Sequence, residues 1–146
     1  MISDEIEIGQ VLWLNVRYQI DVVSDVKHPM LVAKIENDYI EVIAIDKTAG
    51  KVHQLFHKYN LYINSEDPKE SVIYEDSYAQ LNTKLTIDKI DELKKARKTK
   101  AKLSSDKLKE VLTEYSDYQY KYGIDEHRIV HMTSKEILEL NSDLID

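Results

Sequence analysis

Four histidines occur in two pairs with the i, i+4 spacing that suits a metal site on a helix. They are His53 with His57, and His127 with His131. If the first pair lay on a strand, the two side chains would share a face but lie about 13 Å apart. The second pair has no nearby acidic residue that obviously completes a site. We therefore expect solvent-facing histidines and no metal.

A basic run stands out in a chain whose net charge is −7. Residues 94–102 hold six lysines and arginines among nine residues. Such a local concentration of charge can bind the phosphates of a nucleic acid. The alternative is a solvated helix face with its cations near the negative end of the helix dipole. The candidate RNA-binding residues in this run are Lys94, Lys95, Arg97 and Lys98.

Ten tyrosines and one tryptophan are present, and aromatic rings of this kind can stack on nucleic-acid bases. Tyr115, Tyr118 and Tyr122 fall on the apolar stripe of a predicted helix, so we expect them to pack in the core. With only three glycines, the chain has no glycine-rich phosphate loop, and no serine has the setting of a nucleophile. The tyrosines left as candidates for stacking are Tyr18, Tyr39, Tyr59 and Tyr62.

Composition excludes several other functions. The chain has no cysteine, which excludes disulfides, thiolate catalysis and thiolate metal sites and suits a reducing compartment. No apolar run approaches the roughly 18 residues of a membrane span, and the acidic start does not resemble a signal peptide. We expect a cytoplasmic protein of 146 residues with no membrane partner.

The elements that position these residues are strands in the first part of the chain. β-branched and aromatic residues predict strands at 9–16, 30–35, 39–45, 71–74, 77–81 and 83–87. Residues 51–63 are ambiguous, since Val52, Leu55, Phe56 and Tyr59 fit a helical period, but we favour a strand there. The near-continuous apolar run 30–35 indicates a strand covered on both faces, as in a small closed barrel. The loop 19–28 is too long for a tight hairpin, and such loops often carry function.

The pattern becomes helical from Asp88 onward. We predict a helix at 88–102 and a second from Ser104 or Ser105 to a stop at Gly123. Residues 127–132 are expected to be extended, and Thr133 with Glu136 forms a capping box that opens a last helix. The predicted fold class is mainly β plus α: a barrel over residues 1–87 and a helical extension over residues 88–146, packed on the barrel.

Three segments resemble MazF/PemK-type proteins, the ribonuclease toxins of bacterial toxin–antitoxin pairs. They are GQVLWL at 9–14, HPMLV at 28–32, and SVIYEDSYAQL at 71–81, which looks like the closing segment of that family's barrel. The resemblance covers roughly residues 8–87. It implies an SH3-like barrel, a homodimer, an antitoxin partner and the cleavage of single-stranded RNA without metal or other cofactor.

The resemblance also implies site residues. In that family an arginine before the proline-containing strand and a Ser or Thr after the third strand serve catalysis, in which a 2′-hydroxyl attacks phosphorus. This chain has Lys27, His28 and Thr48 at those places. We predict these three as catalytic residues, with histidine as the base and lysine as the charge stabiliser.

The chain departs from the family pattern in two ways. Lysine lacks the bidentate fork of the expected arginine, and Asp46 would repel a phosphate. A second interpretation is therefore kept: a non-catalytic SH3-like barrel that binds a protein or a nucleic acid, for example in a mobile-element or conjugation system. Asp21 and Asp25, which add negative charge to the loop, favour this interpretation.

Overall fold

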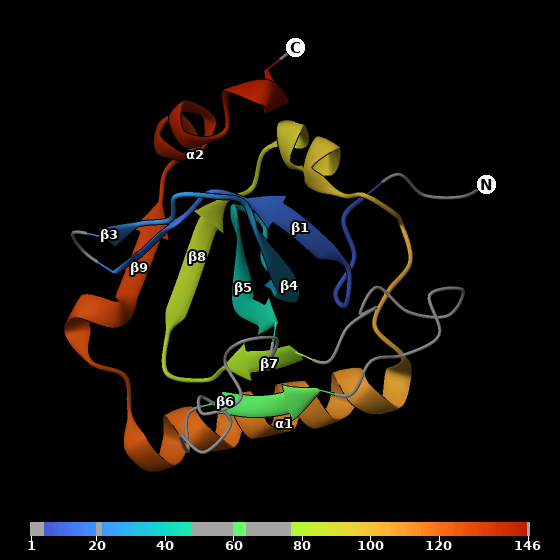
Figure 1. Cartoon of the computed structure of the whole chain (residues 1–146), viewed down its shortest axis with the longest axis vertical. Helices are drawn as coiled ribbons and strands as arrows, with labels where there is room; N and C mark the ends of the chain where they lie inside the picture. Colours follow the sequence, from blue (N-terminus) through green and yellow to red (C-terminus); the bar gives the residue numbers. More distant parts are fainter. Residues whose placement is uncertain (1–4, 20–21, 48–59, 64–76, 146) are drawn as a thin grey trace.

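The computed structural model describes residues 5–19, 22–47, 60–63 and 77–145 (Figure 1). The chain is a sheet-rich α/β protein with a mainly antiparallel sheet. Its strands are β1 (Val11–Leu14), β2 (Arg17–Gln19), β3 (Val22–Val23), β4 (His28–Ile35), β5 (Tyr39–Lys47), β6 (Asn60–Ile63), β7 (Ser77–Gln80), β8 (Lys84–Asp88) and β9 (Ile129–Met132). Its helices are α1 (Ser105–Tyr122), α2 (Ser134–Leu140) and the 3₁₀ helices η2 (Asp91–Ala96), η3 (Glu126–Arg128) and η4 (Ser142–Leu144).

The long strands β4 and β5 form the centre of the sheet. They pair antiparallel, with Leu31 opposite Ile43 and Val32 opposite Val42, and a bulge follows Val32. The other edge of β5 has two partners, since β8 pairs with its first half and β7 with its second half. β9 then extends the sheet by pairing parallel to β8.

The described strands do not close into a barrel. The sheet runs from β1 through β4, β5 and β7 to β6, and no pairing joins β1 to β6. Because β7 and β8 share one edge of β5, the sheet divides into two arms. The expected closed barrel is therefore replaced, over the described residues, by a divided sheet with helices packed on it.

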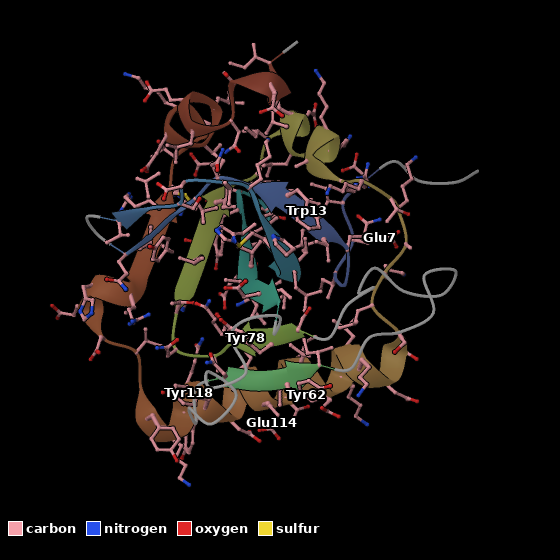
Figure 2. The ribbon with its side chains drawn as sticks, in the orientation of Figure 1. Glu7, Trp13, Tyr62, Tyr78, Glu114 and Tyr118 are labelled. Carbon is pink, nitrogen blue, oxygen red and sulfur yellow. The ribbon has the colours of Figure 1, made fainter. Side chains whose placement is uncertain are left out.

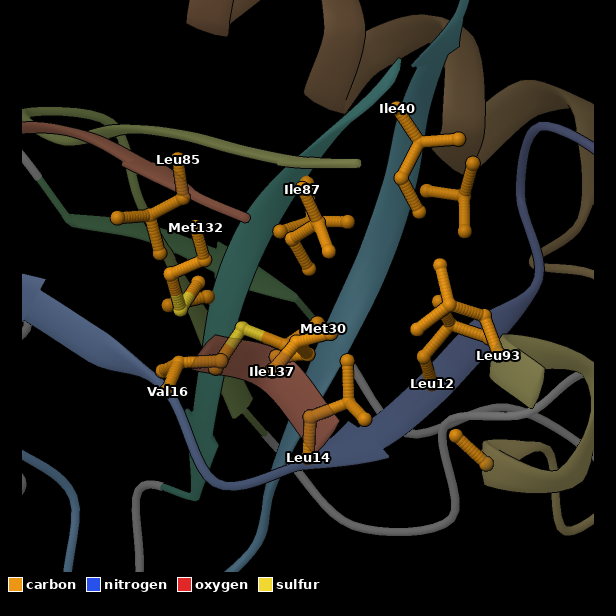
Figure 3. Packing of buried hydrophobic residues seen from close by; sticks show 14 of the residues in the cluster. Leu12, Leu14, Val16, Met30, Ile40, Leu85, Ile87, Leu93, Met132 and Ile137 are labelled. Atoms are coloured by element: carbon orange, nitrogen blue, oxygen red, sulfur yellow. The ribbon is translucent and has the colours of Figure 1, made fainter. Parts of the chain in front are cut away.

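Apolar side chains cover both faces of the central strands. Met30, Leu31 and Val32 are consecutive and almost completely buried, which confirms the prediction from the continuous apolar pattern of this strand. On one face a first core cluster gathers side chains from five strands, η2 and α2 (Figure 3). On the other face a second cluster joins Leu31 and Ile43 to Val111 and Tyr115 of α1. α1 accordingly runs beneath β6 and β7, with α2 at the opposite end of the molecule (Figure 1).

The predicted second helix is confirmed as α1, which ends where the sequence indicated. Gly123 has φ +70°, a conformation that glycine adopts without strain, and its N–H donates to the carbonyl of Gln119. The expected tyrosine stripe is only partly buried. Tyr115 lies in the core, whereas Tyr122 is exposed and packs against Tyr118, with tilted rings and 4.8 Å between their centroids.

The predicted helix over residues 88–102 is wrong. Only η2 is helical, and the following residues run extended along the start of β1. Leu103 N–H donates to the Gly9 carbonyl at 2.9 Å, and the Gln10 amide donates to the Lys100 carbonyl at 3.0 Å. These contacts satisfy the backbone outside a helix, and on a helix the cations three and four residues apart would repel one another.

Gly9 makes this close approach of the two segments possible. Its φ is +98°, and a Cβ on it would lie 3.0 Å from Cδ2 of Leu108. A side chain here would therefore meet both backbone strain and crowding.

The residues after α1 belong to the same core as the sheet. The predicted extended piece is present as β9, and Val130 and Met132 join Ile137 in the first core cluster. The Thr133 half of the predicted capping box is confirmed, because its hydroxyl accepts from the Glu136 N–H at 3.2 Å. The Glu136 carboxylate accepts hydrogen bonds from Arg17. The C-terminal part of the predicted helical extension thus also supplies a strand to the main sheet.

Candidate functional site

A cavity of about 350 Å³ lies where the segment before β4 meets the end of β5. We call it the His28 pocket. Its polar lining comes from the β2–β4 region, β4, β5 and β7, and includes Tyr18, Ser24, Asp25, His28, Asp46 and Gln80. Apolar residues such as Met30 and Ala44 form the rest of the wall.

Local structure explains why these groups meet. His28 begins β4 opposite Leu14 of β1, so its position is set by the sheet. The preceding loop is closed by two bonds between Val16 and Ser24, in which N–H of Ser24 donates to the Val16 carbonyl and N–H of Val16 donates to the Ser24 hydroxyl. Asp46 lies near the end of β5 and accepts a hydrogen bond from the Tyr78 hydroxyl at 3.2 Å.

The chemistry available in the His28 pocket is proton transfer. An imidazole and a carboxylate are the groups that most often act as base and acid in enzymes. The two carboxylates, Asp25 and Asp46, make the pocket electronegative, so a bound phosphate would need a cation beside it. A substrate with a proton to remove would find an acceptor here.

Lys27, predicted beside His28, is directed elsewhere. Its Nζ donates to both carboxylate oxygens of Asp143 in η4, at 2.9 and 2.8 Å. The hydrogen bond from Lys27 holds the pKa of the Asp143 carboxyl below its usual value. Lys27 is half-buried and Asp143 is exposed, so the pair is in contact with water. Thr48, the third predicted catalytic residue, lies outside the described residues, two positions beyond Asp46.

The four predicted RNA-binding residues are brought together. Lys94, Lys95, Arg97 and Lys98 line one hollow of about 350 Å³ with Thr99 and Lys100. The hollow is formed by η2 and the extended residues after it, and not by a helix face as expected.

Acidic and aromatic groups from the N-terminal segment contact this basic hollow. Lys94 forms an ion pair with Glu5 at 3.2 Å, and Arg97 donates to the Gln10 side chain at 3.2 Å. Nζ of Lys98 lies 3.6 Å from the centroid of the Trp13 ring. Figure 2 shows Trp13 on β1 and Glu7 in the segment that precedes it. The positive charge of the run is therefore partly compensated within the chain.

One constellation was missed by reasoning from the sequence. His131 on β9 contacts the Thr86 hydroxyl through Nδ1 and the Asp88 carboxylate through Nε2, each at 2.8 Å. Parallel pairing puts His131 opposite Thr86, and Asp88 lies two residues further on the same face of β8. The sequence alone does not reveal the contact of His131 with Asp88, because the pairing joins residues 43 positions apart.

The two histidine pairs can be compared with a metal site only in the part of the chain that the structure describes. Within it, no group of three or more histidine, aspartate or glutamate side chains could hold a metal ion. His53 and His57 lie outside the described residues. His127 is in η3, and its partner in the predicted pair, His131, is bonded to Thr86 and Asp88 instead.

Comparisons with known proteins do not identify a family for this chain. No protein-family model matches the chain, and no curated protein matches its sequence. No helix among the described residues is long and apolar enough to cross a membrane.

Proposed function

We propose that this chain is a MazF/PemK-type toxin that cleaves single-stranded RNA without a metal, at the His28 pocket. The observation that carries the proposal is the meeting of the pre-β4 loop with the end of β5 around an imidazole and two carboxylates. These are the two segments in which the family resemblance expects catalytic residues. We also propose that the fold is related to the SH3-like barrel of that family. The protein would form a homodimer, bind an antitoxin protein and act in the cytoplasm.

The reaction assigns a role to each group. One group, His28 or a carboxylate of the pocket, removes the proton of a ribose 2′-hydroxyl, whose oxygen then attacks the adjacent phosphorus. The bond from phosphorus to the 5′-oxygen breaks, a 2′,3′-cyclic phosphate forms, and a second group returns a proton to the leaving oxygen. Lys27, exchanging Asp143 for the phosphate, and Thr48 would stabilise the negative charge on the phosphoryl oxygens. Lys94, Lys95, Arg97 and Lys98 would hold the RNA backbone.

The test is RNA cleavage by the wild type and by His28→Ala, with a single-stranded oligoribonucleotide and excess EDTA. We expect the substitution to lower the rate by about 10²- to 10⁴-fold, the usual cost of losing a general acid or base. His127→Ala is the matched control, because His127 is an exposed histidine in η3 and lines no part of the pocket. RNA left intact by the wild type, or cleaved equally by His28→Ala, would refute the enzyme.

A second function, a non-catalytic module that binds a protein or nucleic acid, is favoured by one of the same cations. Lys27 is bonded to Asp143, so the cation expected to stabilise the reacting phosphate is held outside the His28 pocket. A wild type that leaves RNA intact but forms a stable complex with an RNA or a protein would select this function.

A further inference from the structure

A second cavity, of about 520 Å³, lies on the other side of the central strands, between them and α1. We call it the α1 groove. The sheet contributes Lys34, Glu41 and Lys84, and α1 contributes Tyr115, Gln119 and Tyr120. None of these residues lines the His28 pocket, so the groove can be considered without the ribonuclease proposal. Its volume falls within the range of about 300–1,000 Å³ that is typical of small-molecule sites.

The deepest charged group in the groove is a carboxylate. Glu41 is only 7% exposed, and one of its oxygens accepts from the Tyr115 hydroxyl at 2.7 Å. Burial, and then the neighbouring Glu41 charge, raise the pKa of Tyr115, so its hydroxyl stays a donor to Glu41. A carboxylate accepts more than one hydrogen bond, so Glu41 can also receive an N–H from a ligand.

A donor lies beside this acceptor. The Gln119 side-chain nitrogen lies beside the Tyr115 hydroxyl, where its interaction opposes the rise in the pKa of Tyr115. It is buried there without a fully formed hydrogen bond to another described residue. A buried N–H group of this kind is normally satisfied by protein, water or ligand. Glu41 and Gln119 therefore present an acceptor and a donor, which is the pattern that recognises the edge of a planar base.

The rim of the groove has the opposite charge to its floor. Lys34 and Lys84 are both exposed there, and Lys34 has its pKa raised by a hydrogen bond to Glu36 and by the charges of nearby groups, Glu41 among them. Tyr120 is 95% exposed, so one of the aromatic rings lining the groove is open to stacking. A suitable ligand must place an N–H donor deep in the groove and an anion at its mouth.

We propose that the α1 groove binds a nucleotide. In this arrangement the base donates to Glu41 and accepts from Gln119, its ring lies beside Tyr120, and its phosphate contacts Lys34 and Lys84. Guanine fits best, because its adjacent N1–H and N2 amino groups are both donors and its O6 and N7 are acceptors. Inorganic phosphate alone should bind weakly, because it carries no N–H donor for Glu41 and has the same sign of charge.

The experiment is calorimetric titration of the full chain with GMP, guanosine and inorganic phosphate. We expect GMP to bind at least tenfold more tightly than either fragment. Lys34→Ala combined with Lys84→Ala should weaken GMP binding at least tenfold. Lys109→Ala combined with Lys135→Ala is the control, since it removes two exposed lysines that do not line the groove.

Two further arms make the result decisive. Glu41→Gln keeps an acceptor for Tyr115 but removes the charge, and should weaken the binding of GMP at least tenfold. If thermal unfolding shows that this variant does not fold, Gln119→Ala is used in its place. If a 5′-phosphorylated RNA binds but GMP does not, and the Lys34/Lys84 variant loses that binding, the ligand of the groove is the 5′ end of an RNA strand. No binding of GMP or of that RNA, or full GMP affinity in the Lys34/Lys84 variant, would overturn the proposal. His28→Ala should bind GMP normally, whatever its effect on RNA cleavage.

Discussion

Lys27 tests the proposed catalysis at the scale of a single residue, because its ammonium is held by Asp143 and not by a group of the His28 pocket. The pair is in contact with water, and such ion pairs contribute little to stability. We expect Lys27→Ala to leave the Tm unchanged and to slow RNA cleavage by about 10²- to 10³-fold, as for loss of a charge-stabilising group. Asp143→Ala should free the ammonium and leave cleavage equal to or faster than that of the wild type. Slower cleavage in Asp143→Ala would contradict this role for Lys27.

Asp88 gives a second prediction at the scale of residues, on pH. The Ser134 N–H and then His131 hold the pKa of Asp88 below its ordinary value of 3.8. A carboxyl with a lowered pKa in the folded state stabilises the fold above its unfolded pKa, and this contribution is lost as the pH falls through the folded-state pKa. Asp88→Ala should therefore have a lower Tm than the wild type at pH 7, and the difference should shrink as the pH falls below 3.8. Thermal scans across this range provide the measurement, with Asp117→Ala on the exposed face of α1 as control.

The element that offers the cleanest test is α2. Thr133 caps its first turn, since its hydroxyl accepts the Glu136 N–H. Replacing such a cap by alanine costs about 1 kcal/mol, which lowers the Tm by roughly 2–4 °C in a protein of this size. Thr133→Ala should show that loss in thermal unfolding. Thr113→Ala, in the exposed middle of α1, should show none, because alanine is the better helix former there. Equal stability of Thr133→Ala and the wild type would exclude a capping role.

Long helices and strands were largely predictable from the sequence. Very short strands, and a segment held by hydrogen bonds to distant residues, were not. β4, β5 and α1 carry patterns long enough to reveal their period, and all three occur where expected. β2 and β3 span three and two residues, which is too short for a period to appear. The segment after η2 has the composition of a helix, but its backbone contacts Gly9 and Gln10, about 90 residues earlier, and these contacts prevail over propensity.

Contacts between residues far apart in sequence also limit how much of the candidate site could be predicted. His28 was identified because a motif places it, and the basic residues because they are consecutive in sequence. The groups that complete the His28 pocket, such as Ser24 and Gln80, come from separate elements and carry no motif. The Thr86–His131–Asp88 constellation depends on the parallel pairing of β8 with β9, which local sequence patterns do not predict.

On the scale of the whole molecule, β9 and α2 complete the core. Val130, Met132, Ile137 and Leu144 are almost completely buried against the sheet. Deleting residues 124–146 would expose Leu85 and Ile87 on β8 and leave the parallel edge of that strand unpaired. We expect such a truncated chain to aggregate or to lose cooperative unfolding. Deletion of residues 145–146 alone is the control and should leave the fold intact, because Ile145 is exposed. A soluble, cooperatively folded 1–123 fragment would show that the sheet does not need its C-terminal part.

If a ribose 2′-hydroxyl attacks phosphorus in the His28 pocket, as we propose, a strand that lacks this hydroxyl cannot be cleaved there. The measurement compares two single-stranded oligonucleotides in excess EDTA: one all-ribose, and one with 2′-deoxyribose at the nucleotide whose 3′-phosphate is cleaved in the first. We expect cleavage of the all-ribose strand to a 2′,3′-cyclic phosphate and a 5′-hydroxyl, and an intact bond at the deoxy position. Cleavage at the deoxy position, products with a 5′-phosphate, or no cleavage of either strand would contradict this mechanism.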